Sequence, residues 1–137
     1  IYTLWHTLSL HDALPIYEYL GNANDNVLLA VQIEGTEGVE NLDEILAVDG
    51  IDTVYIGPYD LSQSLGLPGQ IHDPRVVDEI KRICDRVRNA GRFLGAYVDD
   101  VETAARYREY GVQFITILVD VVIFARACNE LVTALSG

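Results

Sequence analysis

Basic residues are scarce in this sequence. Lysine and arginine together number 9, against 21 aspartate and glutamate residues, and the formal net charge is −12 at pH 7. A protein that binds nucleic acid or an anionic membrane needs a basic surface, because it must neutralise phosphate groups. We therefore expect neither as a partner, and a chain this acidic is better suited to holding a cation.

Cysteine is also scarce, and long apolar runs are absent. Cys84 and Cys128 are the two cysteines, and 44 positions (128 − 84) separate them. This spacing fits neither a zinc motif nor the disulfide framework of a small secreted domain. Both lie in apolar helical patterns, which predicts buried side chains. No apolar run approaches the roughly 20 residues of a membrane span, and we expect a cytoplasmic protein.

The first sixteen residues differ from the rest of the sequence. The segment IYTLWHTLSLHDALPI has no sustained period of two or 3.6 residues. Its part TLSLHDALPI resembles the conceptual translation of a sequencing adapter. We therefore expect residues 1–16 to be a non-native leader, and we take residues 17–137 as the native domain. On this interpretation His6 and His11 form no metal site.

Four continuous apolar runs predict a parallel sheet. Half of the residues are hydrophobic, so a chain of 137 residues can build the core of about one domain. Continuous runs, rather than alternating ones, are typical of parallel strands covered on both faces. The runs are 27–34, 52–57, 93–98 and 113–119. Helical patterns separate them, which gives an α/β fold with alternating strands and helices.

Two α/β folds fit this order: an open doubly wound sheet, or about half of a (β/α)8 barrel, which needs roughly 250 residues when complete. Doubly wound nucleotide-binding folds bind phosphate at the turn after the first strand. That turn here is 34–38, EGTEG, and its two glutamates are unsuited to an anion. The acidic turn favours the barrel.

Helix boundaries are marked by capping residues. The clearest helix is expected to begin at Pro74, with Asp73 as its N-cap and Gly91 as its C-terminal stop. A second helix follows Asp99, whose spacing to Glu102 is that of a capping box. The last helix is expected to bury four side chains: Phe124, Cys128, Leu131 and Leu135.

An acidic residue follows each predicted strand: Glu34, Asp60, Asp99 and Asp120. Asp99 and Asp120 are suited to cap the next helix. Glu34 is a poor cap, with Thr36 nearby for that role, and its charge needs a partner if it is buried. Glu34 and Asp60 are 26 positions (60 − 34) apart, one β-α-β step, which places them at the same rim. They are either helix caps or a pair that holds Mg²⁺ or Mn²⁺.

The motifs QIE at 32–34 and GPYDLS at 57–62, at this spacing, resemble the HpcH/HpaI family of metal-dependent class II pyruvate aldolases. The resemblance runs from about Tyr17 to the C-terminus, and GVQFITILVDVVIFARA is similar to the family's last strand and helix. It implies a (β/α)8 TIM barrel of the phosphoenolpyruvate/pyruvate-binding type. Residues 17–137 would be its C-terminal half, with four parallel strands and their helices.

The resemblance also implies a reaction. Family members are lyases that reversibly cleave a 4-hydroxy-2-oxo acid to pyruvate and an aldehyde, so the expected partners are small molecules. A divalent ion, Mg²⁺, Mn²⁺ or Co²⁺, would be held by Glu34 and Asp60. A Lewis acid stabilises the enolate that cleavage leaves on pyruvate. No Schiff-base lysine is then needed, and Lys81, the only lysine, is expected to be a solvated helix residue.

Further site residues are implied by the same motifs. Gln32 matches a family residue near bound pyruvate, and the backbone N–H of Tyr59 matches a contact with the substrate carboxylate. Gly57 and Pro58 would shape the corner that presents this stretch. Tyr97 falls where the family lines the pocket with an apolar side chain.

The catalytic histidine and essential arginine of the family lie in the other half of the barrel, so we assign no catalytic residue in this chain. His72 and Arg126 are expected to be structural. We therefore expect little or no activity from the 137-residue chain. The alternatives are a citrate-lyase-like or malyl-CoA-lyase-like enzyme and a non-catalytic α/β module. The resemblance also implies a homo-oligomer in which neighbours exchange the final helix.

Overall fold

The computed structural model describes residues 21–136, which form one four-stranded sheet with helices between the strands. The strands are β1 (Ala30–Ile33), β2 (Thr53–Ile56), β3 (Phe93–Val98) and β4 (Phe114–Ile117). The helices are α3 (Thr36–Glu40), α4 (Leu42–Leu46), α5 (Pro58–Ser64), α6 (Pro74–Asn89), α7 (Val101–Glu109) and α8 (Asp120–Ser136). The expected leader, 1–16, lies outside the described residues.

All strand pairs are parallel, and the strand order in the sheet, β1-β2-β3-β4, is the order in the chain. The pairing puts Gln32, Tyr55, Gly95 and Phe114 side by side in one row across the sheet. Because parallel strands end at the same edge, the loops after β1, β2 and β3 meet at one rim. This is the α/β arrangement that the apolar runs predict.

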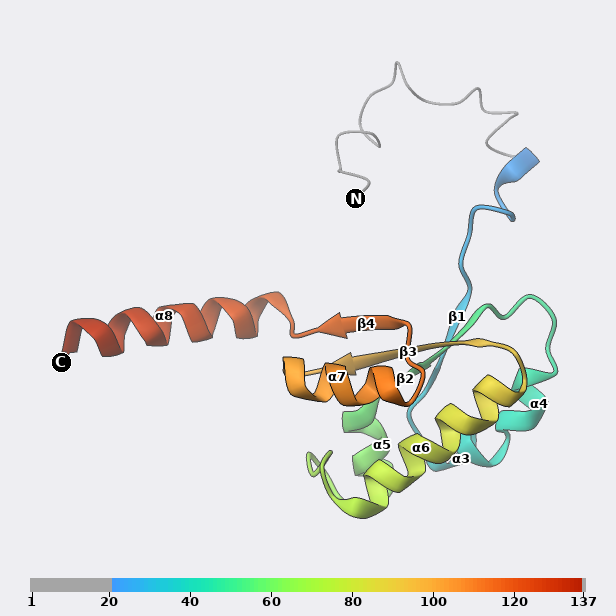
Figure 1. The fold of residues 1–137 in the computed structure, drawn as a ribbon, viewed down its shortest axis with the longest axis horizontal. Coiled ribbons are helices and arrows are strands. Elements are labelled where there is room, and N and C mark those ends of the chain that lie inside the picture. Colours follow the sequence, from blue (N-terminus) through green and yellow to red (C-terminus); the bar gives the residue numbers. More distant parts are fainter. Residues whose placement is uncertain (1–20, 137) are drawn as a thin grey trace.

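Helices α3 to α7 cover one face of the sheet (Figure 1). Fully buried side chains fill this layer: Leu42, Val54, Ile56, Leu61, Ile80, Ile83, Val87 and Leu94. The other face is open within the described residues, where Phe93 is 58% exposed and Phe114 is 48% exposed. The prediction that both faces are covered is therefore met on one face only.

Helix α6 has the predicted ends. The Asp73 carboxylate accepts a hydrogen bond from the Arg75 N–H at 2.9 Å, and Pro74 is the first helical residue. Gly91, with φ of 71°, follows the helix in the left-handed region that favours glycine. Cys84 is buried in this helix, as predicted. The apolar stripe of α6 thus packs on the sheet, with a defined start and stop.

Two predicted caps are wrong. The N-cap of α7 is Asp100, whose carboxylate accepts the N–H of Thr103 at 2.6 Å, and not Asp99. The chain leaving β3 runs one residue further before it turns, so Asp99 stays at the sheet edge. Likewise the N-cap of α3 is Gly35, and the N–H of Thr36 donates to Ser64 Oγ of α5 at 2.7 Å.

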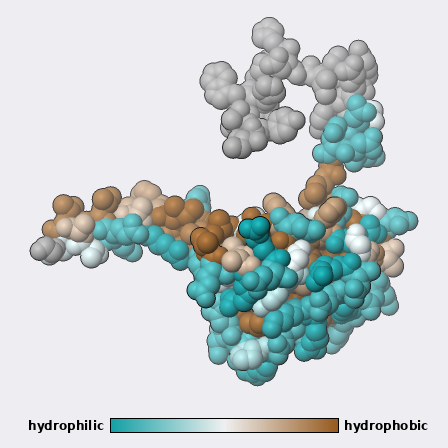
Figure 2. Space-filling view, in the orientation of Figure 1, coloured by the Kyte–Doolittle hydropathy of each residue, from teal (hydrophilic) through white to brown (hydrophobic). Residues whose placement is uncertain are grey.

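The prediction that α8 buries its apolar residues is also wrong. Phe124 is 73% exposed and Leu135 is 87% exposed, Leu131 is exposed as well, and Cys128 is only half-buried. The helix projects away from the sheet after β4, so no other described element covers it (Figure 1). Figure 2 shows apolar surface along α8 and mostly hydrophilic surface over the helix layer. Asp120 is the first residue of α8, and its carboxylate accepts the N–H of Val121 at 2.8 Å.

Among residues 21–136, no helix has both the length and the apolar character that crossing a membrane requires.

Candidate functional site

A cavity of about 230 Å³ lies at the rim where β1, β2 and β3 end. Its lining residues are Gln32, Tyr55, Gly57, Pro58, Tyr59, Asp60 and Tyr97. Six of the seven residues that the motifs single out are thus brought together, although they span three β/α units. The seventh, Glu34, does not line the cavity but adjoins it through Gly57.

The corner after β2 positions one wall of the cavity. Gly57 continues the strand in an extended conformation (φ −98°, ψ 91°), and α5 begins at Pro58. Proline is suited to this first helical position, because its fixed φ matches the helix and its missing N–H is not needed there. Asp60 therefore lies in the first turn of α5, exposed at the rim, and it is not the residue that caps the helix.

Glu34 and Gln32 meet the same corner from β1. Gln32 Nε2 donates a hydrogen bond to Glu34 Oε2 at 2.5 Å. A methyl group added at Gly57 would lie 2.7 Å from Glu34 Oε2 and 2.9 Å from Gln32 Nε2, both closer than atoms normally approach. Gly57, which lies three positions before Asp60 in the chain, thus makes room for the Glu34 carboxylate.

Tyr59 and Tyr97 form a second wall, and Asp99, which does not itself line the cavity, holds them together. Tyr59 Oη donates to one Asp99 carboxylate oxygen at 2.5 Å, and Tyr97 Oη donates to the other at 2.9 Å. The two rings pack edge to face, with their centroids 6.1 Å apart. The hydrogen bond to Asp99, followed by burial, raises the pKa of Tyr59 to about 12. Burial first, and then Asp99, raises the pKa of Tyr97.

Sequence reasoning missed Asp99 and Tyr55 as site residues. The signal for Asp99 is the pair Asp99-Asp100, because a helix has one N-cap and the other carboxylate is free for another role. Tyr55, on β2, lines the cavity, and its hydroxyl is hydrogen-bonded to that of Thr116 on β4. Its ring packs edge to face on Phe114, with centroids 6.0 Å apart.

Three other candidate residues lie apart from the cavity lining. His72 is exposed in the loop before α6, with its Nδ1 3.5 Å from Arg106 Nη2. Lys81 is on α6, where its Nζ lies 5.5 Å from the centroid of the Tyr110 ring. Arg126, on α8, is exposed, and its positive charge opposes the rise in the pKa of Tyr97. The expectation that Lys81 is a solvated helix residue is met.

The donor atoms at the corner suit a hard divalent cation. Glu34 and Asp60 offer carboxylate oxygens, the ligand type that Mg²⁺ and Mn²⁺ prefer. Within residues 21–136, no three or more His, Cys, Asp or Glu side chains cluster closely enough to enclose an ion by themselves. Two carboxylates leave several coordination positions for water or a chelating ligand, which is the usual arrangement for Mg²⁺.

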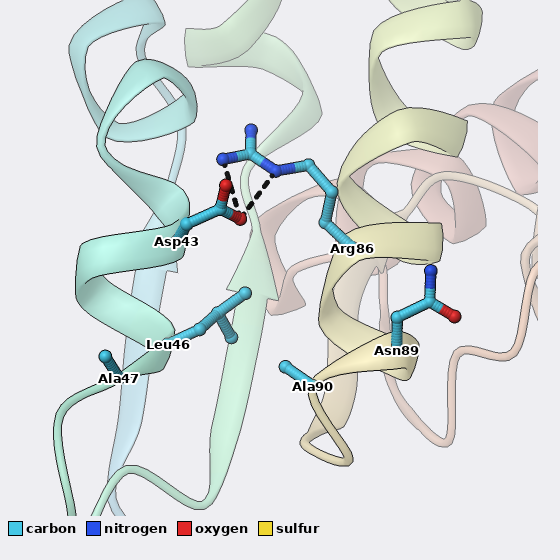
Figure 3. A pocket seen from close by; sticks show the side chains of 6 residues that line it. All are labelled: Asp43, Leu46, Ala47, Arg86, Asn89 and Ala90. Atoms are coloured by element: carbon cyan, nitrogen blue, oxygen red, sulfur yellow. Dashed lines mark hydrogen bonds and ion pairs between the residues drawn. The ribbon is translucent and has the colours of Figure 1, made fainter.

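A larger surface hollow, of about 510 Å³, lies on the helix layer between α4 and α6 (Figure 3). Its charged groups satisfy each other: Arg86 Nη2 is 3.0 Å from Asp43 Oδ1, and Arg86 Nη1 donates to the Val39 carbonyl at 2.7 Å. The hollow is far from the strand ends, and no unpaired charge in it points to a ligand. We therefore take the smaller cavity at the rim as the candidate site.

Comparison with known proteins shows what the chain as a whole is similar to. Residues 12–127 match the family described as HpcH/HpaI aldolase/citrate lyase. Over 115 residues the chain is 41% identical to a hydroxypyruvate/pyruvate aldolase of Roseovarius nubinhibens, which covers 84% of this chain and 45% of that protein. It is 40% identical over 116 residues to a 4-hydroxy-2-oxo-heptane-1,7-dioate aldolase of Shigella sonnei. That match covers 85% of this chain and 44% of the Shigella protein.

The structural comparison agrees. A solved HpcH/HpaI aldolase/citrate lyase family protein from Burkholderia cenocepacia superposes with a TM-score of 0.81 at 34% identity, over 88% of this chain and 47% of that one. The structural neighbours are TIM barrels, which confirms the predicted fold class of four parallel β/α units. The chain spans less than half the length of the curated relatives that it matches.

Proposed function

The chain belongs to the HpcH/HpaI aldolase/citrate lyase family, and from that premise we propose that its rim is the metal-binding and 2-oxo-acid-binding part of a class II aldolase site. The reaction is the reversible cleavage of a 4-hydroxy-2-oxo acid to pyruvate and an aldehyde. Its carbon–carbon bond breaks between C3 and C4, the 4-hydroxyl loses its proton, and the electron pair stays on the pyruvate part as an enolate.

The observation that carries this proposal is the absence of a side chain at Gly57. The Glu34 carboxylate and the Gln32 amide occupy the space that any Cβ at position 57 would need. The corner thus presents Glu34 beside α5, with Asp60 in the first turn of that helix. Two carboxylates that converge on one site would repel each other, and a cation bound between them would remove that repulsion.

Each residue at the corner has a separate role in this proposal. Glu34 and Asp60 hold Mg²⁺ or Mn²⁺, or Co²⁺ in their place. The ion, when bound, supplies a Lewis acid for the negative charge that develops on the keto oxygen. Gln32 orients Glu34 through their hydrogen bond and faces the pyruvate part. The backbone N–H of Tyr59, in the first turn of α5, would donate to the substrate carboxylate.

Manganese binding tests the two acidic residues. We expect Glu34→Gln and Asp60→Asn each to weaken Mn²⁺ binding to this chain by about tenfold or more, because affinity in such sites depends on the number of charged ligands. Free Mn²⁺ measured by electron paramagnetic resonance gives the dissociation constant. Asp100→Asn is the control, since it removes the same charge outside the cavity lining. Unchanged affinity in both site variants would refute the assignment.

Location and assembly complete the proposal. Cys84 and Cys128 are both free thiols, which suits the reducing cytoplasm. The exposed apolar side chains of α8, among them Phe124 and Leu135, support a homo-oligomer in which this helix packs on a neighbouring copy, because large exposed apolar surfaces usually mark interaction sites.

A further inference from the structure

The side chains of Tyr59, Tyr97 and Asp99, here called the β3 wall, have no role in the function proposed so far. The metal corner (Gln32, Glu34, Gly57 and Asp60) is built from β1, β2 and the start of α5. In the β3 wall, Tyr97 and Asp99 come from the end of β3, and Tyr59 reaches Asp99 from α5. The cavity extends from Gln32 on β1 to Tyr97 on β3. A ligand whose 2-oxo acid end is held at the corner therefore meets the β3 wall with a more distant part of its carbon chain.

The β3 wall offers hydrogen-bond acceptors to the cavity. Each phenol has one proton, and both protons are donated to Asp99, at 2.5 Å and 2.9 Å. What remains on Tyr59 and Tyr97 are the oxygen lone pairs, which accept hydrogen bonds.

The wall is also negatively charged. The Asp99 carboxylate accepts both phenol hydrogen bonds, and the carboxylate of Asp60 lines the same cavity. Arg126 of α8 is the positive group that acts on Tyr97, but its effect on the pKa of Tyr97 is smaller than that of Asp99. A ligand carboxylate beside the two phenols would meet two acceptor oxygens and the like charge of Asp99, which disfavours a ligand that ends in a carboxylate.

We propose that the β3 wall selects the aldehyde partner, accepting hydrogen bonds from its hydroxyl groups and rejecting a terminal carboxylate. This rests on the proposed aldolase function. This selection distinguishes two kinds of aldehyde. One kind ends in a carboxylate, such as the four-carbon aldehyde that cleavage of 4-hydroxy-2-oxo-heptane-1,7-dioate releases. The other kind, a hydroxyaldehyde, carries neutral hydroxyl groups that donate hydrogen bonds. The β3 wall fits the hydroxyaldehyde, and Asp99 is the positioning residue that sets this preference.

Two uncleavable probes test the preference. Both 6-hydroxy-2-oxohexanoate and 2-oxoadipate have six carbons and no 4-hydroxyl, and they differ in ending with a hydroxyl or a carboxylate. Binding to the Mn²⁺-loaded chain is measured by the broadening of probe proton resonances. We expect the hydroxyl probe to bind at least about tenfold more tightly, a conservative value for a like-charge contact screened by salt.

Variants then assign the preference to the β3 wall. Asp99→Asn removes the charge and one acceptor site, and we expect the preference to fall to less than about threefold. Asp100→Asn is the matched control: it removes the same charge one position further on, keeps a residue suited to N-capping, and should leave the preference intact. Tyr97→Phe removes one phenol acceptor, so it should weaken the hydroxyl probe and leave the carboxylate probe unchanged.

The outcomes separate this inference from the function on which it rests. Equal affinity of the native chain for the two probes overturns the inference, as does an unaltered preference in a folded Asp99→Asn chain. If Asp99→Asn does not fold, an unaltered preference in Tyr97→Phe overturns it. Failure of pyruvate itself to bind the Mn²⁺-loaded native chain overturns the proposed function, and this inference with it.

Discussion

At the scale of single residues, the candidate site depends on what one position lacks. Gly57 has an ordinary backbone conformation, so its role does not come from conformational freedom. It comes from space, because the Glu34 carboxylate and the Gln32 amide fill the volume beside it. The motif GPYDLS shows the glycine in the sequence, but only the packing of β1 against this corner shows why a larger residue does not fit.

Gly57→Ala should disturb the metal corner more than the fold. The added methyl group displaces Glu34 and Gln32, so we expect Mn²⁺ affinity to fall by about tenfold and the free energy of unfolding to fall by about 1–3 kcal/mol. Gly35→Ala is the control, since a methyl group there meets only Ser64 Oγ, at an ordinary 3.8 Å. Unchanged Mn²⁺ affinity in Gly57→Ala would contradict the crowding at this corner.

The tyrosines of the β3 wall give the chain a pH dependence at high pH. Because the folded pKa of Tyr59, about 12, is above its ordinary value of 10.0, its hydrogen bond to Asp99 stabilises the fold fully below pH 10. That contribution is lost as the pH rises through about 12. Absorbance of the phenolate at 295 nm measures the titration, and Asp99→Asn should lower the pKa of Tyr59. An unshifted titration in that variant would exclude Asp99 as the cause.

At the scale of elements, sequence patterns predicted the alternating strands and helices well, but they predicted the ends of the helices with mixed success. The ends of α6 follow from Asp73, Pro74 and Gly91, because each satisfies a local requirement of the helix. The cap of α7 was expected at Asp99, but which residue caps the helix depends on how far β3 extends, and that is decided by pairing with its neighbours. The cap was therefore misplaced by one residue, and the role of Asp99 at the rim was missed.

Strand β3 contains a second position where space is limiting. A methyl group at Gly95 would lie 2.7 Å from the Tyr55 ring and 3.3 Å from the backbone oxygen of Phe114. Gly95→Ala should therefore lower the free energy of unfolding by about 1–3 kcal/mol, measured by urea denaturation. Gly38→Ala, which meets Ile33 at an ordinary 3.5 Å, should be neutral or stabilising. Equal stability of the two variants would contradict tight packing of Tyr55 over β3.

At the scale of the whole molecule, apolar surface is distributed unevenly. The helix layer is hydrophilic outside and closely packed inside, whereas α8 and the open sheet face expose large apolar side chains (Figure 2). Helical periodicity identified α8 and its apolar residues, but it could not say what covers them, because burial depends on neighbours that the periodicity does not contain. Its prediction of burial failed for that reason.

Self-association should follow from the exposed surface of α8. We expect the apparent mass of the chain to rise with concentration in light scattering coupled to gel filtration, because large exposed apolar patches favour association. Replacing both Phe124 and Leu131 by serine should reduce this dependence, whereas Asn129→Ser, a polar exchange on the same helix, should not. A double variant that associates like the native chain would remove α8 from the interface.

The strand order of the sheet also bears on how the chain folds. Each strand pairs with the one that precedes it in the sequence, so every new β/α unit adds to structure already present. Folding can therefore advance in the direction of synthesis, as is usual for units that leave the ribosome in turn. The proposed metal corner requires only β1, β2 and the start of α5. On such a route it is assembled before the tyrosines of the β3 wall have a strand to hold them.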